Sequence, residues 1–167
     1  MIRAAVLTVS DSAAAGTAAD LSGPAICRRC EELSWSIASV ATEADDRDAI
    51  AERLRHWCDN EIASVILTTG GTGVALRDIT PEATRDVIDR EIPGIAELMR
   101  ARGLEQTSFS VLSRAVVGTR NRTLIVNLPG SPRGALHSLS IVETLVPHIV
   151  DLLNGRTAHS GEDRMRH

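Results

Sequence analysis

A glycine-rich turn followed by one acid is the part of this chain best suited to chemistry. A short apolar run at 65–68 ends in Gly70-Gly71-Thr72-Gly73, and Asp78 follows before the next helix start. Such a turn leaves backbone N–H groups uncovered by side chains, so it can bind phosphate or another anion. A carboxylate beside it adds a ligand for a metal ion. A tight strand-to-helix turn with an ordinary turn acid explains the same pattern without any function.

Two further acids follow the ends of predicted strands. Asp45 lies in an acidic run at 44–48, and Asp11 follows Ser10 at the end of the first apolar run. In a functional interpretation, Asp45 shares an edge with the glycine turn, and Ser10 and Asp11 bind phosphate through hydroxyl and N–H groups. Without function, the acidic run caps and charges the following helix. Ser10 and Asp11 then form a plain hydroxyl or Asx turn.

A proline-bounded loop near the end of the chain is the fourth candidate. It reads Asn127-Leu128-Pro129-Gly130-Ser131-Pro132, and two prolines make it rigid just before a predicted helix. The start of a helix favours anions. Ser113 and Arg114 add a hydroxyl group and a guanidinium fork suited to phosphate.

Alternating strands and helices must position these groups. The expected strands are 3–10, 35–41, 65–68, 114–118 and 124–128, and the expected helices are 24–33, one around 50–58, 80–92, 95–102 and 133–153. This alternation predicts an α/β fold with a mainly parallel sheet, and the pair at 114–128 predicts one mixed or antiparallel edge. Ligands of such sheets bind at the carboxyl ends of the strands. We therefore expect the loops 10–16, 70–78 and 127–131 to converge.

The composition excludes several classes of protein. All 18 cationic side chains are arginine, so the chain has no lysine nucleophile, Schiff base or Walker lysine. The net charge of −4 argues against a basic nucleic-acid surface, and aromatic residues, at 2%, are too few to stack bases. The apolar runs are too short to span a bilayer, and no signal peptide pattern follows Met1. We expect a cytoplasmic protein with no nucleic-acid or membrane partner.

The cysteines are predicted to be structural. Cys27 and Cys30 match the C-x-x-C spacing but fall inside an expected helix, and Cys58 stands alone. No second pair of metal ligands accompanies them. Buried or half-buried thiols are therefore expected in place of redox or zinc chemistry.

The order and spacing of these motifs resemble the molybdopterin adenylyltransferase family of molybdenum-cofactor biosynthesis (Mog/MoaB-like). The resemblance covers about residues 3–155, so we treat 1–155 as one domain and 156–167 as a polar, flexible tail. The matching segments are LTVSD (7–11), SGP (22–24), Asp45, TTGGTG (68–73), RDITPEAT (77–84), IPG (92–94), LSR (112–114) and LIVNLPGSP (124–132). The family fold implied is a three-layer αβα sandwich.

The resemblance also implies a reaction and its partners. The terminal phosphate of molybdopterin attacks the α-phosphate of MgATP, giving adenylylated molybdopterin and pyrophosphate. A homotrimer and a separate downstream molybdenum-insertion protein are further expectations. Asp45 and Asp78 match acids that the family uses for catalysis. The residues expected to bind nucleotide or pterin are Ser10, Asp11, Gly70, Gly71, Thr72, Gly73, Ser113, Arg114, Asn127, Gly130 and Ser131.

The chemistry of the nucleophile assigns a role to the two acids. A phosphate monoester with a second pKa of about 6 is already largely dianionic at neutral pH, so no general base is needed. Two polyanions must instead be neutralised and positioned. Because Mg²⁺ is often held by one or two carboxylates plus substrate phosphates, Asp45 and Asp78 are expected magnesium ligands.

The match is not complete, and one alternative stays open. Ser12 stands where many family members carry arginine, and residues 74–76 replace a run that contains proline. A non-catalytic molybdopterin-binding or assembly protein on the same fold is the alternative function.

Overall fold

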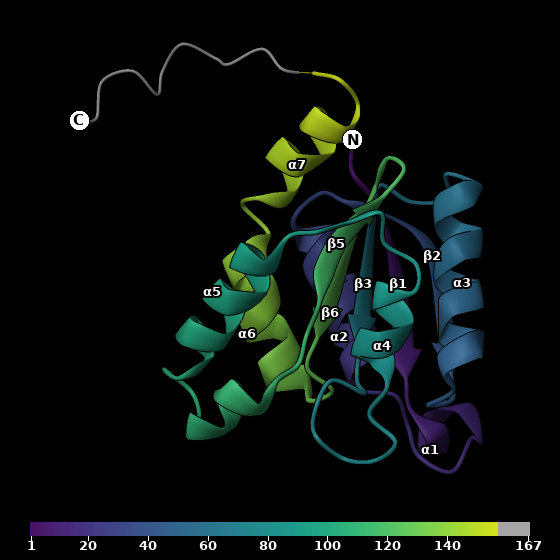
Figure 1. The fold of residues 1–167 in the computed structure, drawn as a ribbon, viewed down its shortest axis with the longest axis vertical. Helices are drawn as coiled ribbons and strands as arrows, with labels where there is room; N and C mark the ends of the chain where they lie inside the picture. Colours follow the sequence, from purple (N-terminus) through teal and green to yellow (C-terminus); the bar gives the residue numbers. More distant parts are fainter. Residues whose placement is uncertain (157–167) are drawn as a thin grey trace.

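Buried apolar strands form the centre of a six-stranded sheet with the order β2-β1-β3-β6-β5-β4 (Figure 1). The computed structural model describes residues 1–156, so the expected tail lies outside the described residues except for Arg156. The strands are β1 Arg3–Val9, β2 Ser36–Glu43, β3 Val65–Thr69, β4 Arg90–Glu91, β5 Val117–Arg120 and β6 Thr123–Leu128. Every residue of β3 and β6 is buried, as expected for strands covered on both faces.

The pairing of the strands confirms a mainly parallel sheet with an antiparallel edge. The strands β2, β1, β3 and β6 are parallel, whereas β5 is antiparallel to β6 and β4 is antiparallel to β5. The chain leaves β1 for β2 on one side and returns to β3 on the other side. The strand order therefore reverses between β1 and β3. A reversal of this kind creates a crevice at the carboxyl ends of the strands, where α/β sheets bind ligands.

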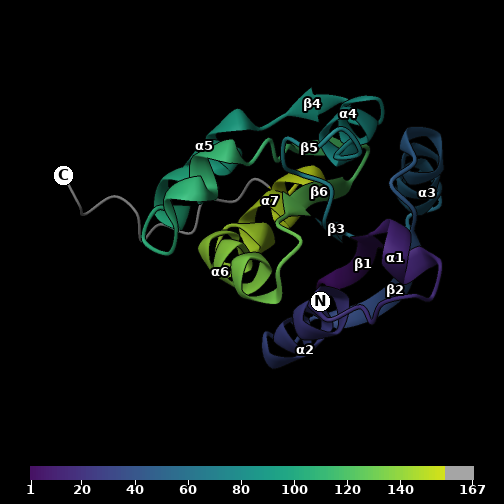
Figure 2. The ribbon, with the colours of Figure 1, turned by 90° about the horizontal axis from the view of Figure 1, so that it is seen from below.

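Helices cover both faces of the sheet, which confirms the three-layer αβα sandwich (Figure 2). The helices are α1 Asp11–Ala14, α2 Ser22–Glu32, α3 Arg47–Asp59, α4 Thr80–Arg85, α5 Pro93–Gly103, α6 Pro132–Val142 and α7 Val146–Leu153, with a 3₁₀ helix η1 at Ser108–Leu112. One core joins the sheet to α2, α5, α6 and α7, and the other joins it to α3 and α4. Neighbouring residues of β1 alternate between them, with Val6 in the first core and Leu7 in the second.

The antiparallel edge differs from its sequence-based prediction. The helix expected to reach residue 92 ends at Arg85, and Arg90–Glu91 forms the edge strand β4. Two backbone bonds flank this strand, from Asp89 N to Thr119 O at 2.7 Å and from Ile92 N to Val117 O at 2.7 Å. The strand expected at 114–118 begins three residues later, as β5 at Val117, and the Arg114 N–H donates to Thr72 O in the glycine turn. The helix was expected to continue because the spacing of Val87, Ile88 and Ile92 fits a helix as well as a short edge strand.

The long helix expected at 133–153 is two helices. α6 ends at Val142, α7 begins at Val146, and their axes differ by 60°. Pro147 lies in the first turn of α7. It has no N–H to donate to the carbonyl four residues earlier, and its ring crowds that carbonyl, so a continuous helix is disfavoured. Among residues 1–156 no single helix is long and apolar enough to cross a bilayer; the bent pair α6–α7 meets that test by length and composition alone.

The cysteines have the environment that was predicted. Cys30 and Cys58 are buried and Cys27 is half-buried, and all three are free thiols. Burial raises the pKa of both Cys30 and Cys58 to about 12. These thiols therefore stay protonated and unreactive at neutral pH.

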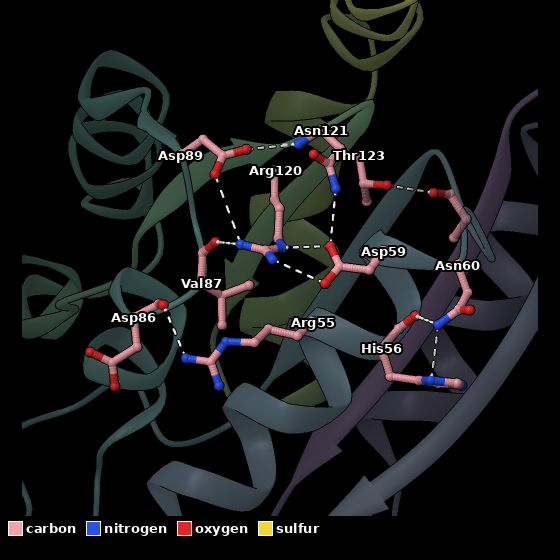
Figure 3. Close-up of polar contacts among 11 residues, drawn as sticks. Arg55, His56, Asp59, Asn60, Asp86, Val87, Asp89, Arg120, Asn121 and Thr123 are labelled. Carbon is pink, nitrogen blue, oxygen red and sulfur yellow. Dashed lines mark hydrogen bonds and ion pairs between the residues drawn. The ribbon is translucent and has the colours of Figure 1, made fainter.

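An arginine network fixes the hairpin turn at the end of the sheet opposite the crevice (Figure 3). Arg120 donates to both carboxylate oxygens of Asp59 at 2.8 and 3.0 Å and to the Val87 carbonyl at 3.0 Å. The Asn121 backbone N–H donates to Asp89 at 2.9 Å. Asn121 has a φ of +51°, a conformation that asparagine tolerates better than most residues. These contacts tie β5 and β6 to the end of α3.

Asn127, in β6, connects β3, α4 and the residue before β5 inside the molecule. Its amide nitrogen donates to the hydroxyl groups of Thr68 and Thr84, each at 2.9 Å, and its amide oxygen accepts from Val116 N at 3.0 Å. The residue is 0% exposed. All of these partners are buried; the Thr84 hydroxyl also donates to Thr80 O, whereas the Val116 N–H and the Thr68 hydroxyl are bonded here by Asn127.

We predict that Asn127→Ala lowers the free energy of unfolding by about 3 kcal/mol, because three buried polar groups lose a partner. Urea denaturation measures the change. Ser140→Ala is the control: its exposed hydroxyl bonds to the His137 carbonyl of its own helix, so a change within about 0.5 kcal/mol is expected. A similar loss in both variants would contradict the role given to Asn127.

Candidate active site

The loops after β1, β3 and β6 meet at the carboxyl edge of the sheet. A cavity of about 410 Å³, here called the polar cavity, is lined by residues of all three loops. A second cavity of about 600 Å³, here called the apolar cavity, extends from the glycine turn across α5 and η1. Gly71, Asp78 and Gly130 line both cavities and are called the shared rim. The two cavities therefore give two neighbouring compartments around one acid.

The apolar cavity is suited to a mostly uncharged group. Met99 and Ala115 form buried parts of its wall, and Phe109, with 73% of its surface exposed, lies at its mouth. Hydroxyl groups of Ser113 and Ser138 also line it. A mainly apolar wall with a few polar groups is the usual composition of a small-molecule site.

Two left-handed glycines shape the turn between the cavities. Gly70 has a φ of +99° and Gly71 a φ of +67°, and both values strain any residue with a side chain. A Cβ atom on Gly70 would overlap the carbonyl oxygen of Val9 in β1, and one on Gly71 would overlap the Thr80 hydroxyl. Gly130 approaches from the other side, where a Cβ atom would lie 3.3 Å from the Gly70 Cα. Three strand ends therefore meet with only backbone between them.

Thr80 closes the turn from the helix side. Its hydroxyl group donates to the Gly70 carbonyl at 2.9 Å, and its backbone N–H donates to the Gly71 carbonyl at 3.1 Å. The residue is completely buried. These bonds fix the distance between the turn and the start of α4, and therefore the position of Asp78 just before that helix.

Arg114 holds the same loop from the opposite side. Its backbone N–H donates to Thr72 O at 2.8 Å, and its guanidinium donates to Gly73 O at 2.7 Å and Asp78 O at 2.6 Å. It also forms an ion pair with Glu82. The guanidinium expected to bind phosphate is thus occupied by the backbone at both ends of the 73–78 loop. A direct phosphate contact of Arg114 remains a prediction.

The acid Asp78 stands on the shared rim. One carboxylate oxygen accepts from Ala75 N at 2.9 Å, and the same oxygen would lie 2.8 Å from a Cβ atom on Gly73. Only glycine at 73 therefore leaves this carboxylate in place. The other oxygen is not used by any hydrogen bond within the described residues.

Asp45 and Asp11 hold each other through their backbones. The Asp11 N–H donates to Asp45 Oδ2 and the Asp45 N–H donates to Asp11 Oδ1, both at 3.0 Å. Burial raises the pKa of Asp45, and the negative charges of Asp11 and Asp78 act in the same direction. The hydrogen bond from Arg77 lowers the pKa of Asp11. A nearby cation would therefore stabilise the ionised form of Asp45.

The remaining predicted site residues divide into three groups. Ser10 lines the polar cavity and Thr72, Gly73, Ser113 and Ser131 line the apolar cavity. The hydroxyl groups of Ser10 and Ser131 also cap α1 and α6 by accepting from Ala13 N and Gly134 N. Asp11 and Asn127 line neither cavity. The interior bonds of Asn127 do not support direct contact with a ligand.

The donors around the polar cavity fit a magnesium ion that substrates also bind. Among residues 1–156, no three or more His, Cys, Asp or Glu side chains are grouped to hold a metal ion. The half-buried Asp45 and the rim acid Asp78 nevertheless line one cavity, and both supply hard oxygen ligands. Mg²⁺ is commonly bound by one or two carboxylates with the rest of its shell from water and phosphates. The site has the composition expected of that arrangement.

Comparison with known proteins identifies the family. The sequence pattern of a family described as "Probable molybdopterin binding domain" matches residues 5–148. This chain belongs to that family. The matched segment includes most of β1, the glycine turn, Asp45, Asp78 and the Asn127–Pro132 loop, so the family pattern spans every loop of the candidate site.

Individual members of the family are similar over nearly their whole length. A molybdopterin adenylyltransferase from Helicobacter pylori (strain J99) is 41% identical over 99% of this chain and 95% of its own. The Escherichia coli K12 molybdopterin adenylyltransferase is 36% identical over 92% of this chain and 86% of its own. The crystal structure of the molybdopterin biosynthesis enzyme MoaB from Thermus thermophilus superposes with a TM-score of 0.87 at 47% identity, covering 93% and 98% of the two chains. The resemblance inferred from the motifs is confirmed.

We predict that Gly70→Ala destabilises the protein by several kcal/mol more than Gly16→Ala in urea denaturation. Both glycines have a positive φ, so both alanine variants carry a strain of about 1–2 kcal/mol. Gly16 has no neighbour within 4 Å, whereas Gly70 faces the Val9 backbone. Equal losses in the two variants would mean that the close approach of the strand ends does not constrain the turn.

Proposed function

We propose that this chain is a molybdopterin adenylyltransferase that transfers AMP from MgATP to the terminal phosphate of molybdopterin. The observation that carries the proposal is the meeting of Asp45, Asp78 and the glycine turn around one polar cavity beside a larger apolar one. Relatives that bear this name are 34–41% identical over most of this chain. As an enzyme, the chain is a nucleotidyltransferase.

The proposed reaction needs no general base. The terminal phosphate of molybdopterin, largely dianionic at neutral pH, forms a bond to the α-phosphorus of ATP while the bond to the β-phosphate oxygen breaks. Pyrophosphate leaves with the electron pair of that bond. The main obstacle is repulsion between two polyanions, so positioning and charge stabilisation supply most of the catalysis.

The chain's own residues provide the positioning. The backbone of Gly71–Gly73 would present N–H groups to phosphate oxygens, whereas the Gly70 N–H donates to Leu128 O. Ser10, Gly130 and Ser131 lie at the walls around this turn. Asp45 and Asp78 would hold Mg²⁺, which supplies charge neutralisation between the phosphates when bound. The apolar cavity would take a heterocycle of one substrate.

Several further properties belong to this proposal. ATP is the co-substrate, and the adenylylated product passes to a separate molybdenum-insertion protein. We also propose a homotrimeric, cytoplasmic enzyme. The co-substrate, the insertion protein and the homotrimer are proposed from the family resemblance, and the cytoplasmic location from the sequence pattern.

Pyrophosphate release tests the function. Purified protein is mixed with ATP, Mg²⁺ and molybdopterin, and we expect pyrophosphate and adenylylated molybdopterin in equal amounts. Omitting molybdopterin or Mg²⁺ is the control and should stop release. Binding of molybdopterin without any release would favour the alternative function of a non-catalytic binding or assembly protein.

We predict that Asp78→Asn lowers kcat by about 100- to 1,000-fold, because it removes a charge that is needed only when the polyanions meet. The fold and substrate binding should stay near wild type, since asparagine can still accept the bond from Ala75 N. Asp48→Asn, an exposed acid of the neighbouring acidic run, serves as the control. Near-normal adenylylation by the Asp78 variant would refute the metal role.

A further inference from the structure

Arg77 makes a two-pronged ion pair at the edge of the polar cavity. Its Nε and Nη2 atoms donate to Asp11 Oδ2 and Oδ1 at 2.5 and 2.8 Å, and Nη2 also reaches the Asp45 carbonyl at 3.1 Å. This one guanidinium therefore contacts both members of the Asp11–Asp45 pair. Within residues 1–156, Asp11 pairs with no arginine other than Arg77, and no arginine forms an ion pair with the carboxylate of Asp45 or Asp78.

The hydrogen bonds between Asp11 and Asp45 set the position of Asp45. Asp11 Oδ1 accepts from the Asp45 N–H, while Asp45 Oδ2 accepts from the Asp11 N–H. The first bond uses the Asp11 carboxylate and the second uses the Asp11 backbone, so Asp11 holds both the backbone and the carboxylate of Asp45. Because Arg77 binds both oxygens of that carboxylate, it fixes the plane of the carboxylate as well as its position. The connection runs from Arg77 through Asp11 to Asp45.

The charges around the polar cavity also favour a positioning role for Arg77. Asp45 lies near the charges of Asp11 and Asp78, so three carboxylates must be kept close before any substrate or cation arrives. Repulsion favours a splayed arrangement of such groups. A cation that pairs with Asp11 and touches the backbone of Asp45 opposes that repulsion without occupying the Asp45 carboxylate.

We propose that Arg77 is a positioning residue that, through Asp11, holds Asp45 in place for the proposed adenylyl transfer. The inference rests on the proposed function for its catalytic consequence, but its structural part stands without it. Asp11, which lines neither cavity, then serves as the link between Arg77 and Asp45.

An ordinary surface ion pair is the competing explanation, and the chain contains a matched control. Arg47 makes the same two-pronged contact with Asp86, at 2.6 and 2.8 Å. The side chains of Arg77 and Arg47 are 66% and 54% exposed. Such exposed pairs contribute at most about 1 kcal/mol to stability. The two arginines should therefore differ in their effect on catalysis and agree in their effect on folding.

The first test needs no substrate. Amide hydrogen exchange is followed by NMR in wild-type protein and in the Arg77→Gln and Arg47→Gln variants. We expect the amides of Asp11 and Asp45 to exchange about tenfold faster in Arg77→Gln only. The Ser10 amide, which donates to Glu43 O, is the internal reference. Unchanged exchange at Asp11 and Asp45 would overturn the proposal, whatever reaction the protein catalyses.

The second test is a double-mutant cycle on pyrophosphate release. We expect Arg77→Gln to lower kcat by about 10- to 100-fold with little change in KM, because a small displacement of a positioned group costs that much. Arg77→Lys, which keeps the charge but not the fork, should recover part of the loss. If Arg77 acts through Asp11, then Arg77→Gln combined with Asp11→Asn is no slower than Asp11→Asn alone.

The outcomes separate the two hypotheses. A rise in KM with unchanged kcat, or multiplicative losses in the double variant, would assign Arg77 to direct substrate contact and overturn its positioning role. A wild-type protein that releases no pyrophosphate, but whose Asp11 and Asp45 amides respond to Arg77→Gln, would refute the proposed function and leave the structural inference supported.

Discussion

The close approach of Gly70 to the backbone of β1 is the constraint on which the rest of the site depends. Only a residue without a side chain can pass the Val9 carbonyl with a φ of +99°, and Gly130, in the loop after β6, lies against Gly70 from the other side. The ends of β1, β3 and β6 therefore converge at the point where the strand order reverses. The loops that follow them need no further element to bring Asp45 and Asp78 to one cavity. The packing of the strand ends therefore also determines where the site lies.

Electrostatics then determines what the site can hold. Negative side chains gather where the proposed substrates are themselves polyanions, an arrangement that is unfavourable without a cation. The protein fixes these acids with backbone N–H groups and with arginine side chains that bond to the loop backbone, as Arg114 does at the Asp78 carbonyl. The carboxylates of Asp45 and Asp78 thereby each keep one oxygen atom that forms no hydrogen bond within residues 1–156. Magnesium suits such a site, because it commonly binds one or two carboxylates and takes its other ligands from water and substrate phosphates.

Much of this arrangement could be predicted from the sequence, because its signals are local. Continuous apolar runs indicated the buried strands, and small residues after them indicated the turns of the site. What sequence could not supply was the direction of each side chain. Asn127 and Arg114 lie in motifs of the site, yet they bond to backbone and buried hydroxyl groups. Arg77 gave no signal beyond its place beside Asp78, because its partners are 66 and 32 residues away in the chain. The strand β4 was missed because two exposed residues carry no pattern.

A crystal structure with Mg²⁺ and a non-hydrolysable ATP analogue tests the central claim most directly, because it shows which loops meet around the phosphates. The account predicts the α-phosphate at the shared rim of Gly71, Asp78 and Gly130, the cation between Asp45 and Asp78, and N–H groups of the glycine turn on the phosphate oxygens. A nucleotide bound elsewhere, for example in the cavity beside Arg3 and Arg122 at the opposite end of the sheet, would contradict it.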